Sequence, residues 1–154
     1  MLKTTPAETA GLKVRTSSLI YQTQRGPQFI DITDDVSNLI SESGIENGFV
    51  VVFSRHTTAA ITINENEAGL IADLEALLHR MLPHDHDYEH NIDHPTEDGE
   101  VPNGHSHCQH IFLGSSEHIP VVGGRLTFGK WQRLFLVELD RAREREVVVQ
   151  LLGE

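Results

Sequence analysis

The sequence predicts an α+β domain with a largely antiparallel sheet, and three observations carry this prediction. Short apolar runs that are typical of strands come before, between and after two segments with helical periodicity. The chain has 154 residues, the usual length of one compact domain, so residues 1–154 are treated as a single domain. Its 38% hydrophobic content is typical of a globular rather than a disordered protein.

The first half of the chain contains three predicted strands and one predicted helix. Residues 12–24 mix β-branched and polar side chains and predict one strand or a bent pair. The apolar run 48–55 predicts a buried strand, and 57–64 is expected to continue it or to form its hairpin partner. A helix that stops at Gly44 is predicted by apolar residues at helical spacing, which are Ile32, Val36, Leu39 and Ile40.

Residues 68–83 predict an amphipathic helix that ends at Pro83. Its apolar face consists of Leu70, Leu74, Leu77, Leu78 and Met81. Asn64 or Asn66 is expected to bond the free amides at the start of this helix. The polar residues that follow, 83–104, predict a loop of a length that is usually functional or disordered.

The second half of the chain predicts one short helix and further strands. The helix is expected to begin after Asn103 as its N-cap. The strands are predicted at 117–124, 125–140 and 143–152. Three leucines of the middle segment cannot share one strand face, which leaves room for a bulge or bend, and Trp131 is expected in the core.

Composition excludes several classes of function. With 12 basic and 23 acidic residues the net charge is −11, and no run of Lys and Arg offers the basic face that nucleic-acid binding needs. The mixed segment 141–147, RAREREV, predicts a solvated strand edge or turn.

No apolar run approaches the roughly 20 residues of a membrane span. The single cysteine, Cys108, is expected to be a small buried apolar residue and excludes an intramolecular disulfide, which favours a cytoplasmic protein.

Histidines are concentrated in one interval of the chain. Nine of the ten lie between His79 and His118. Imidazole is the commonest metal ligand in proteins, and zinc takes three or four such donors at about 2.0–2.1 Å. No HExxH or CxxC signature is present. Any one of these histidines is more often a solvated loop residue, but the set as a whole favours a metal site, with His79 and His118 assigned to structure.

The segment 54–60, SRHTTAA, supplies further polar candidates at the end of a predicted strand. The guanidinium of Arg55 and the hydroxyls of Thr57 and Thr58 suit a phosphate or carboxylate. His56 is a candidate ligand or proton donor, and Glu65 a candidate general base. The same residue types also suit the plain polar end of a strand, so both interpretations stay open.

Several of these segments together resemble one known family. Residues 115–140, SSEHIPVVGGRLTFGKWQRLFLVELD, are similar to the signature of the YjbQ family, often labelled secondary thiamine-phosphate synthase. The matching positions are Ser116, Ile119, Val121, Gly124, Gly129, Trp131, Gln132 and Leu134, and Lys130 stands where the family usually has Thr. HTTAAITINEN, Asp73, YEHN and NGHSH also resemble family segments, in family order. The resemblance covers nearly the whole chain.

The resemblance implies a fold and an assembly. The expected fold is α+β, with two packed, mostly antiparallel sheets and two to three helices. The expected assembly is a homotrimer formed around a β-rich interface.

The resemblance also implies a site. His56, His90 and His107 match the family's most regular histidines, and His105 matches a more variable position. The expected metal ligands are His90, His107 and His105, with His56 as the alternative third ligand. The expected catalytic residues are His56 and Glu65, and the expected substrate-binding residues are Arg55, Thr57, Thr58 and Lys130.

The family label implies that a pyrimidine-methyl diphosphate is joined to a thiazole phosphate. Departure of a diphosphate normally calls for Mg²⁺ held by carboxylates, whereas histidine ligands favour zinc, so thiamine-phosphate synthesis is expected as a secondary reaction. We therefore expect a metal-dependent enzyme on a small anionic or phosphorylated substrate, with zinc as the first metal and Mg²⁺ as the second. The alternatives are a trimeric metal- or metabolite-binding protein without turnover, and an assembly protein with incidental histidines.

Overall fold

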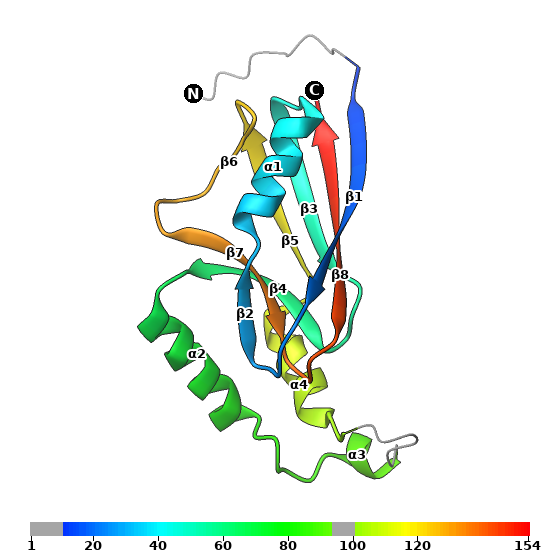
Figure 1. Ribbon diagram of the computed structural model, residues 1–154, viewed down its shortest axis with the longest axis vertical. Coiled ribbons are helices and arrows are strands. Elements are labelled where there is room, and N and C mark those ends of the chain that lie inside the picture. The colour runs from blue at the N-terminus through cyan, green and yellow to red at the C-terminus, as the bar shows by residue number, and fades with distance from the viewer. Residues whose placement is uncertain (1–10, 94–100) are drawn as a thin grey trace, which may run out of the picture.

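The structure is a computed structural model, and it describes residues 11–93 and 101–154 (Figure 1). The elements, in chain order, are β1 (Lys13–Gln22), β2 (Gln28–Asp31), α1 (Thr33–Ser43), β3 (Asn47–Ser54), β4 (Ala59–Glu65), α2 (Ala68–Met81), α3 (Glu89–Asp93), α4 (Gly104–Leu113), β5 (Ser116–Val122), β6 (Arg125–Leu126), β7 (Gln132–Glu138) and β8 (Glu144–Gly153).

The strands form two antiparallel sheets, as predicted. A five-stranded sheet has the order β1-β8-β3-β5-β6, and a three-stranded sheet has the order β2-β7-β4. The described residues contain four helices, where two to three were expected, because the polar segment after Pro83 includes the short α3. None of these helices is long and apolar enough to cross a lipid bilayer.

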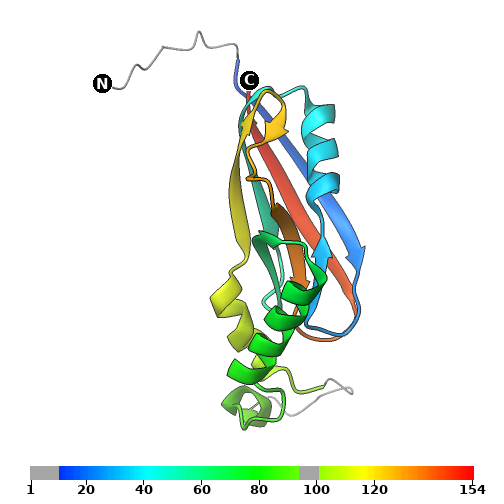
Figure 2. The same cartoon turned by 90° about the vertical axis from the view of Figure 1, so that its left-hand side faces the viewer.

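The sheets and helices form three layers around two apolar cores (Figure 2). The larger core lies between the five-stranded sheet and a layer made by the three-stranded sheet and α1. The smaller core lies on the opposite face of the three-stranded sheet, under α2 and α4. Both views place α3 and α4 at the end of the molecule opposite the C-terminus (Figures 1 and 2).

Strand β7 is buried on both faces, which explains the apolar run that sequence analysis could not place on one face. Leu134 and Leu136 enter the larger core, and Phe135 and Val137 enter the smaller one. The pairing of β7 with its two neighbours is continuous, so the bulge for which the sequence left room is absent from this strand. Trp131 precedes β7 in a turn and is 60% exposed, so its assignment to the core was wrong.

Strands β3 and β4 belong to different sheets, so neither the continuous strand nor the hairpin expected for 48–64 forms. β3 pairs with β5 and β8, whereas β4 pairs with β7. The turn between them therefore crosses from one sheet to the other. This crossing places the segment 55–58 beside the start of β8, where part of the predicted site lies.

The helix ends follow local chemistry, with one correction. Gly44 ends α1 in the left-handed conformation, with φ of 66°, as the sequence predicts. Glu67, rather than Asn64 or Asn66, caps α2 by accepting hydrogen bonds from the backbone amides of Gly69 and Leu70, both at 2.8 Å. Expectation and structure differ because Asn64 lies within β4 and the Asn66 side chain donates to Asp31, which leaves Glu67 at the residue just before the helix.

Candidate functional site

The chain segment that carries His90 is held against the first turn of α4. The backbone amide of Gly104 donates to the Asn91 side chain at 2.9 Å, and a methyl group on Gly104 would lie only 2.6 Å from Cβ of Tyr88. The Tyr88 hydroxyl donates to the carbonyl of Pro83 at 2.9 Å. These contacts set α3 beside α4 and bring the His90 ring to His107, with ring centroids 4.7 Å apart.

His105 lies on a different side of α4 and belongs to a second histidine pair. Residues two apart on a helix point about 200° apart, so His105 cannot share the direction of His107. Its ring instead approaches His84, with centroids 4.5 Å apart. The predicted set of His90, His107 and His105 is therefore divided between two pairs. Within 11–93 and 101–154, no group of three or more His, Cys, Asp or Glu residues is arranged to hold a metal ion.

The hydrogen bonds of His105 select one tautomer of its ring. The Ser106 hydroxyl donates to the carbonyl of Leu139 at 2.6 Å and lies 3.0 Å from Nε2 of His105. Because the serine proton is used on the carbonyl, Nε2 must carry a proton and donate to the serine oxygen. Nδ1 of His105 is then an acceptor, and it is buried without a hydrogen-bond partner among the described residues.

The electrostatic environment keeps His105 neutral. Burial, followed by the neighbouring His84, lowers its pKa to about 4. Burial, followed by His90, likewise lowers the pKa of His107 below its ordinary value of 6.5. Both rings are thus uncharged at pH 7, which is the form that binds a metal ion or accepts a proton.

The β3–β4 turn places three predicted residues beside the start of β8. Arg55 forms an ion pair with Glu146 at 2.8 Å. The backbone amide of Glu146 donates to Nε2 of His56 at 2.9 Å, so the proton of a neutral His56 is on Nδ1. Partial burial, followed by the positive charge of Arg145, lowers the pKa of His56. Thr57 is exposed in the turn and offers a hydroxyl to solvent.

Thr58 belongs to a buried polar network that sequence analysis missed. Its hydroxyl and carbonyl accept hydrogen bonds from Nη2 of Arg145 at 3.0 and 3.2 Å. Arg145 is fully buried and paired with the equally buried Glu138. The expectation that 141–147 is solvated is therefore wrong at Arg145. The alternation of Arg and Glu in the sequence concealed the partner, because Glu138 lies on β7, which belongs to the other sheet.

Glu65 and Lys130 lie far from both histidine pairs. Glu65 faces Gln132 at the opposite end of the β4–β7 ladder from Glu138, and six residues of antiparallel strand span roughly 20 Å. Lys130 lies over the ring of Trp131, 4.3 Å from its centroid. Within one subunit these two side chains therefore do not join the predicted site.

A cavity of about 230 Å³ opens beside the His84–His105 pair. It is lined by Arg25, Gly26, His79, His84, Val101, His105, Asp140 and Arg141. Asp140 is held there by hydrogen bonds from Arg143 at 2.6 Å and from Asn103 at 3.1 Å. Asn103 begins α4 as predicted, but its side chain binds this carboxylate instead of capping the helix. Of these lining residues, sequence analysis named only His105 as a site residue, because the others come from separate segments of the chain.

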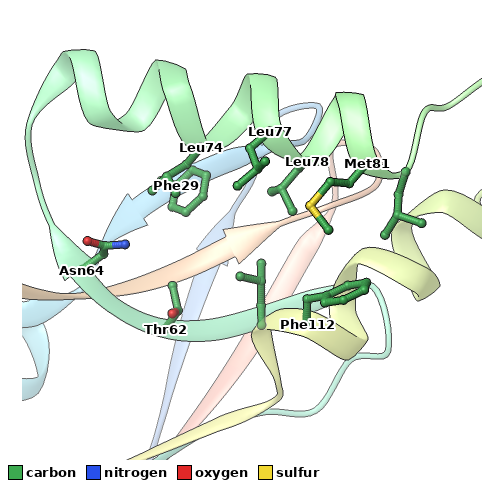
Figure 3. Close-up of a pocket in the computed structure, with 10 residues that line it drawn as sticks. Phe29, Thr62, Asn64, Leu74, Leu77, Leu78, Met81 and Phe112 are labelled. Carbon is green, nitrogen blue, oxygen red and sulfur yellow. The ribbon is translucent and has the colours of Figure 1, made fainter.

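A second, apolar groove lies between α2 and the three-stranded sheet (Figure 3). Leu74, Leu77 and Met81 of α2 face Phe112 of α4 across a space of about 240 Å³ above β4. Of the predicted apolar face of α2, only Leu78 is fully buried. None of the described residues that line this groove is titratable, so they can bind a ligand but supply no group for proton transfer.

The outward face of the five-stranded sheet carries large exposed apolar side chains among polar ones such as Thr16 and Gln150. Val14 and Ile20 of β1 and Phe49 and Phe53 of β3 are each 41–55% exposed. Their strand partners, Leu152 and Val148 among them, extend the same face. An apolar surface of this kind is typical of a protein–protein contact.

Comparisons with known proteins agree with the fold. Residues 17–154 match the family described as UPF0047 protein YjbQ-like. A UPF0047 protein of Methanothermobacter thermautotrophicus is 42% identical over 144 residues, which cover 93% of this chain and 95% of that protein. A UPF0047 protein of Bacillus subtilis is 32% identical and covers 88% of this chain and 98% of its own.

Solved structures show the same likeness. A YbjQ-like protein of Sulfolobus solfataricus superposes with a TM-score of 0.85 at 38% identity, covering 94% of this chain and 100% of that one. A YjbQ/UPF0047 family protein of Clostridium acetobutylicum gives a TM-score of 0.79 at 36% identity, covering 88% and 98%. With its sequence signature, its two-sheet architecture and these relatives in agreement, this chain belongs to the YjbQ-like UPF0047 family.

Proposed function

We propose that this protein is a metal-dependent enzyme that acts on a small anionic or phosphorylated substrate, with thiamine-phosphate synthase activity as a secondary reaction. The observation that carries the proposal is the His90–His107 pair, in which two rings from separate helices lie 4.7 Å apart at one end of the molecule. Two such imidazoles can bind the same ion, with water or other protein groups in the remaining positions. Imidazole ligands favour zinc, and Mg²⁺ is the second candidate.

His105 takes a different part in this proposal from the one expected. Its ring pairs with His84, so we assign the metal to His90 and His107 alone within a subunit. Arg55 and Thr57 remain candidates for the substrate anion, since both are exposed. Thr58 is a positioning residue, because Arg145 already takes its hydroxyl. His56 retains a proton on Nδ1 that it can donate.

The remaining predicted residues fit the proposal only across a subunit boundary. Glu65 and Lys130 lie at the far end of the β4–β7 ladder, so they could reach the histidines only from another copy of the chain. We propose that the protein is a cytoplasmic homotrimer. The support is the exposed apolar face of the five-stranded sheet, with Phe49 and Phe53 at its centre.

One observation favours the alternative of a trimeric metal- or metabolite-binding protein without turnover. His56 and Thr58, two of the residues expected to act on a substrate, already accept hydrogen bonds from the protein itself. A binding protein needs no free proton-transfer group. Turnover of any phosphorylated substrate by the metal-loaded protein would exclude this alternative.

Metal analysis tests the proposal directly. The purified protein is loaded with zinc, dialysed and measured by mass spectrometry of its metal content, together with His90→Ala, His107→Ala and the control His86→Ala. His86 is exposed on the same segment, beside Tyr88 and outside the pair. We expect one ion per chain in the wild type and the control, and loss of that ion in the other two variants. An ion retained by both His90→Ala and His107→Ala would exclude the pair as the metal site.

A further inference from the structure

We propose that the cavity beside His84 and His105 is a binding site for a small oxyanion that carries an O–H group, of which hydrogen phosphate is the simplest. The monoanions of phosphate monoesters, and 2-hydroxy carboxylates, share this chemistry. The inference goes beyond the proposed function, because the cavity contains neither His90 nor His107 and would bind its ligand whether or not the protein is an enzyme.

The first support is an acceptor without a donor. The ring proton of His105 is on Nε2, from which it is donated in a hydrogen bond to the Ser106 oxygen, so Nδ1 has a lone pair. The His105 side chain is 7% exposed, and Nδ1 has no hydrogen-bond partner among the described residues. A buried acceptor left without a partner costs about 1–3 kcal/mol. A ligand with an O–H group would supply the missing donor.

The second support is the sign of the charge around the cavity. Among the described residues, the guanidinium groups of Arg25 and Arg141 line it, together with the carboxylate of Asp140. That carboxylate is already neutralised, because Arg143 and Asn103 both donate to its Oδ2. In a chain with a net charge of −11, two arginines at one cavity favour an anion as the ligand.

The third support is size and access. The cavity measures about 230 Å³, which exceeds the roughly 150 Å³ of a cavity known to hold a benzene molecule. It therefore accommodates phosphate with a small organic group attached. Arg25 and His84 are exposed, whereas His105 is buried, so an entering anion would meet Arg25 and His84 first and the acceptor last.

The affinity for sulfate, compared with that for phosphate, distinguishes this proposal from binding by charge attraction alone. Sulfate has the shape of phosphate but carries no proton at neutral pH, so one of its oxygens would face the lone pair of His105 Nδ1. A site built to pair a buried polar group rejects an analogue that leaves the group unpaired. We expect phosphate to bind at least about tenfold more tightly than sulfate, which corresponds to one hydrogen bond with a charged group.

The experiment is calorimetric titration at pH 7 of protein freed of metal with a chelator, so that failure of the metal proposal cannot affect the result. Inorganic phosphate, sulfate, glycolate and acetate are compared. We expect saturable binding of phosphate, one per chain, with sulfate and acetate much weaker. Glycolate binding above acetate, with little affinity for phosphate, would identify a hydroxy acid as the source of the same chemistry.

Matched variants locate the binding. Arg25→Gln and His84→Ala should each weaken phosphate binding about tenfold. Arg15→Gln and His86→Ala are exposed outside the cavity and should leave it unchanged. His105→Phe should abolish the preference for phosphate over sulfate. If that variant does not fold, the preference of the wild type for phosphate over sulfate and the phosphate affinity of Arg25→Gln still test the proposal. Saturable binding of phosphate and sulfate with equal affinity, no saturable binding of either phosphate or glycolate, or insensitivity of the bound ligand to both Arg25→Gln and His84→Ala would overturn the proposal.

Discussion

Arg145 and Glu138 form an ion pair that is sealed from solvent, with side-chain exposures of 1% and 0%. Nε of the guanidinium donates to one carboxylate oxygen at 2.6 Å, and Nη2 donates to the other. Thr23 and the backbone amide of Asp140 also donate to the carboxylate, at 2.7 and 2.9 Å, and Thr58 accepts from the guanidinium. The pair therefore links β1, β7, β8 and the β3–β4 turn at the end of the molecule where the histidines lie.

Removal of one member of this pair should destabilise the protein strongly. In Glu138→Gln the guanidinium of Arg145 stays buried without its counter-charge, and we expect a loss of about 3–5 kcal/mol of unfolding free energy. The double variant Glu138→Leu/Arg145→Met removes both charges and should lose less than the single variant. Urea denaturation followed by circular dichroism measures both. A double variant at least as unstable as Glu138→Gln would contradict this account.

A second charged contact predicts a dependence of stability on pH. Partial burial acts to raise the pKa of Asp31, but hydrogen bonds from Arg133, Thr33 and Asn66 outweigh it and hold the pKa below 3.8. The unfolded chain thus binds a proton at a higher pH than the folded one, so this stability is complete above pH 3.8 and is lost as pH falls through the lower, folded pKa.

Asp31→Asn should therefore cost about 1 kcal/mol at pH 7, a value kept small because Arg133 is partly exposed, and the difference from wild type should vanish in strong acid. Asp34→Asn is the matched control, because Asp34 pairs with the same arginine but is 81% exposed. Thermal unfolding across pH 2–7 measures both variants. A difference for Asp31→Asn that is constant with pH would show that shape, and not charge, is responsible.

The contact between Gly104 and Tyr88 predicts a structural effect on the His90–His107 pair. In Gly104→Ala the new methyl group would lie 2.6 Å from Tyr88 Cβ, so α3 must move away from α4. Overpacking of this kind typically costs about 1–3 kcal/mol. Nuclear magnetic resonance should show loss of the contact between the two histidine rings. Gly129→Ala is the control, because the nearest atom there is 3.4 Å away on the flexible Gln132 side chain, and it should preserve the contact.

The apolar face of the five-stranded sheet predicts the effect of a charge on assembly. Phe53→Glu should convert the proposed trimer into monomers, because a carboxylate would be buried without a partner at the interface. Trp131→Glu makes the same kind of change at another exposed aromatic side chain and should leave the trimer intact. Sedimentation velocity distinguishes the two species. A trimer disrupted by Trp131→Glu alone would place the interface elsewhere.

Those features of the fold that depend on neighbours in sequence were predictable. The period of Val36 and Ile40 and the stop at Gly44 define α1 because helix contacts span three or four residues. The partner of β4 was not predictable, since its pairing with β7 depends on which faces are buried in the complete fold. Trp131 was misplaced for a related reason, because its size favours burial while its position in a turn exposes it.

The site shows the same division. Sequence identified the histidine interval and both His90 and His107, but not which rings would meet. That outcome depends on the contact of Gly104 with the α3 segment and on the direction in which each residue leaves α4. The burial of Arg145 could not be foreseen either, because nothing in a charged segment indicates a counter-charge on a strand of the other sheet.

The pairing of β1 with β8 has a consequence for how the protein folds during synthesis. Lys13 lies opposite Gly153 and Gln22 opposite Glu144, so nearly the entire chain separates the two strands. β8 also lies between β1 and β3, so neither of these strands can form its backbone hydrogen bonds to β8 before β8 has been made. On the ribosome, the larger sheet therefore cannot be completed until β8, the last of its strands to be translated, has left the exit tunnel. Until then β1 and β3 present unpaired edges, and a chaperone that shields such edges would have its greatest effect on the nascent chain.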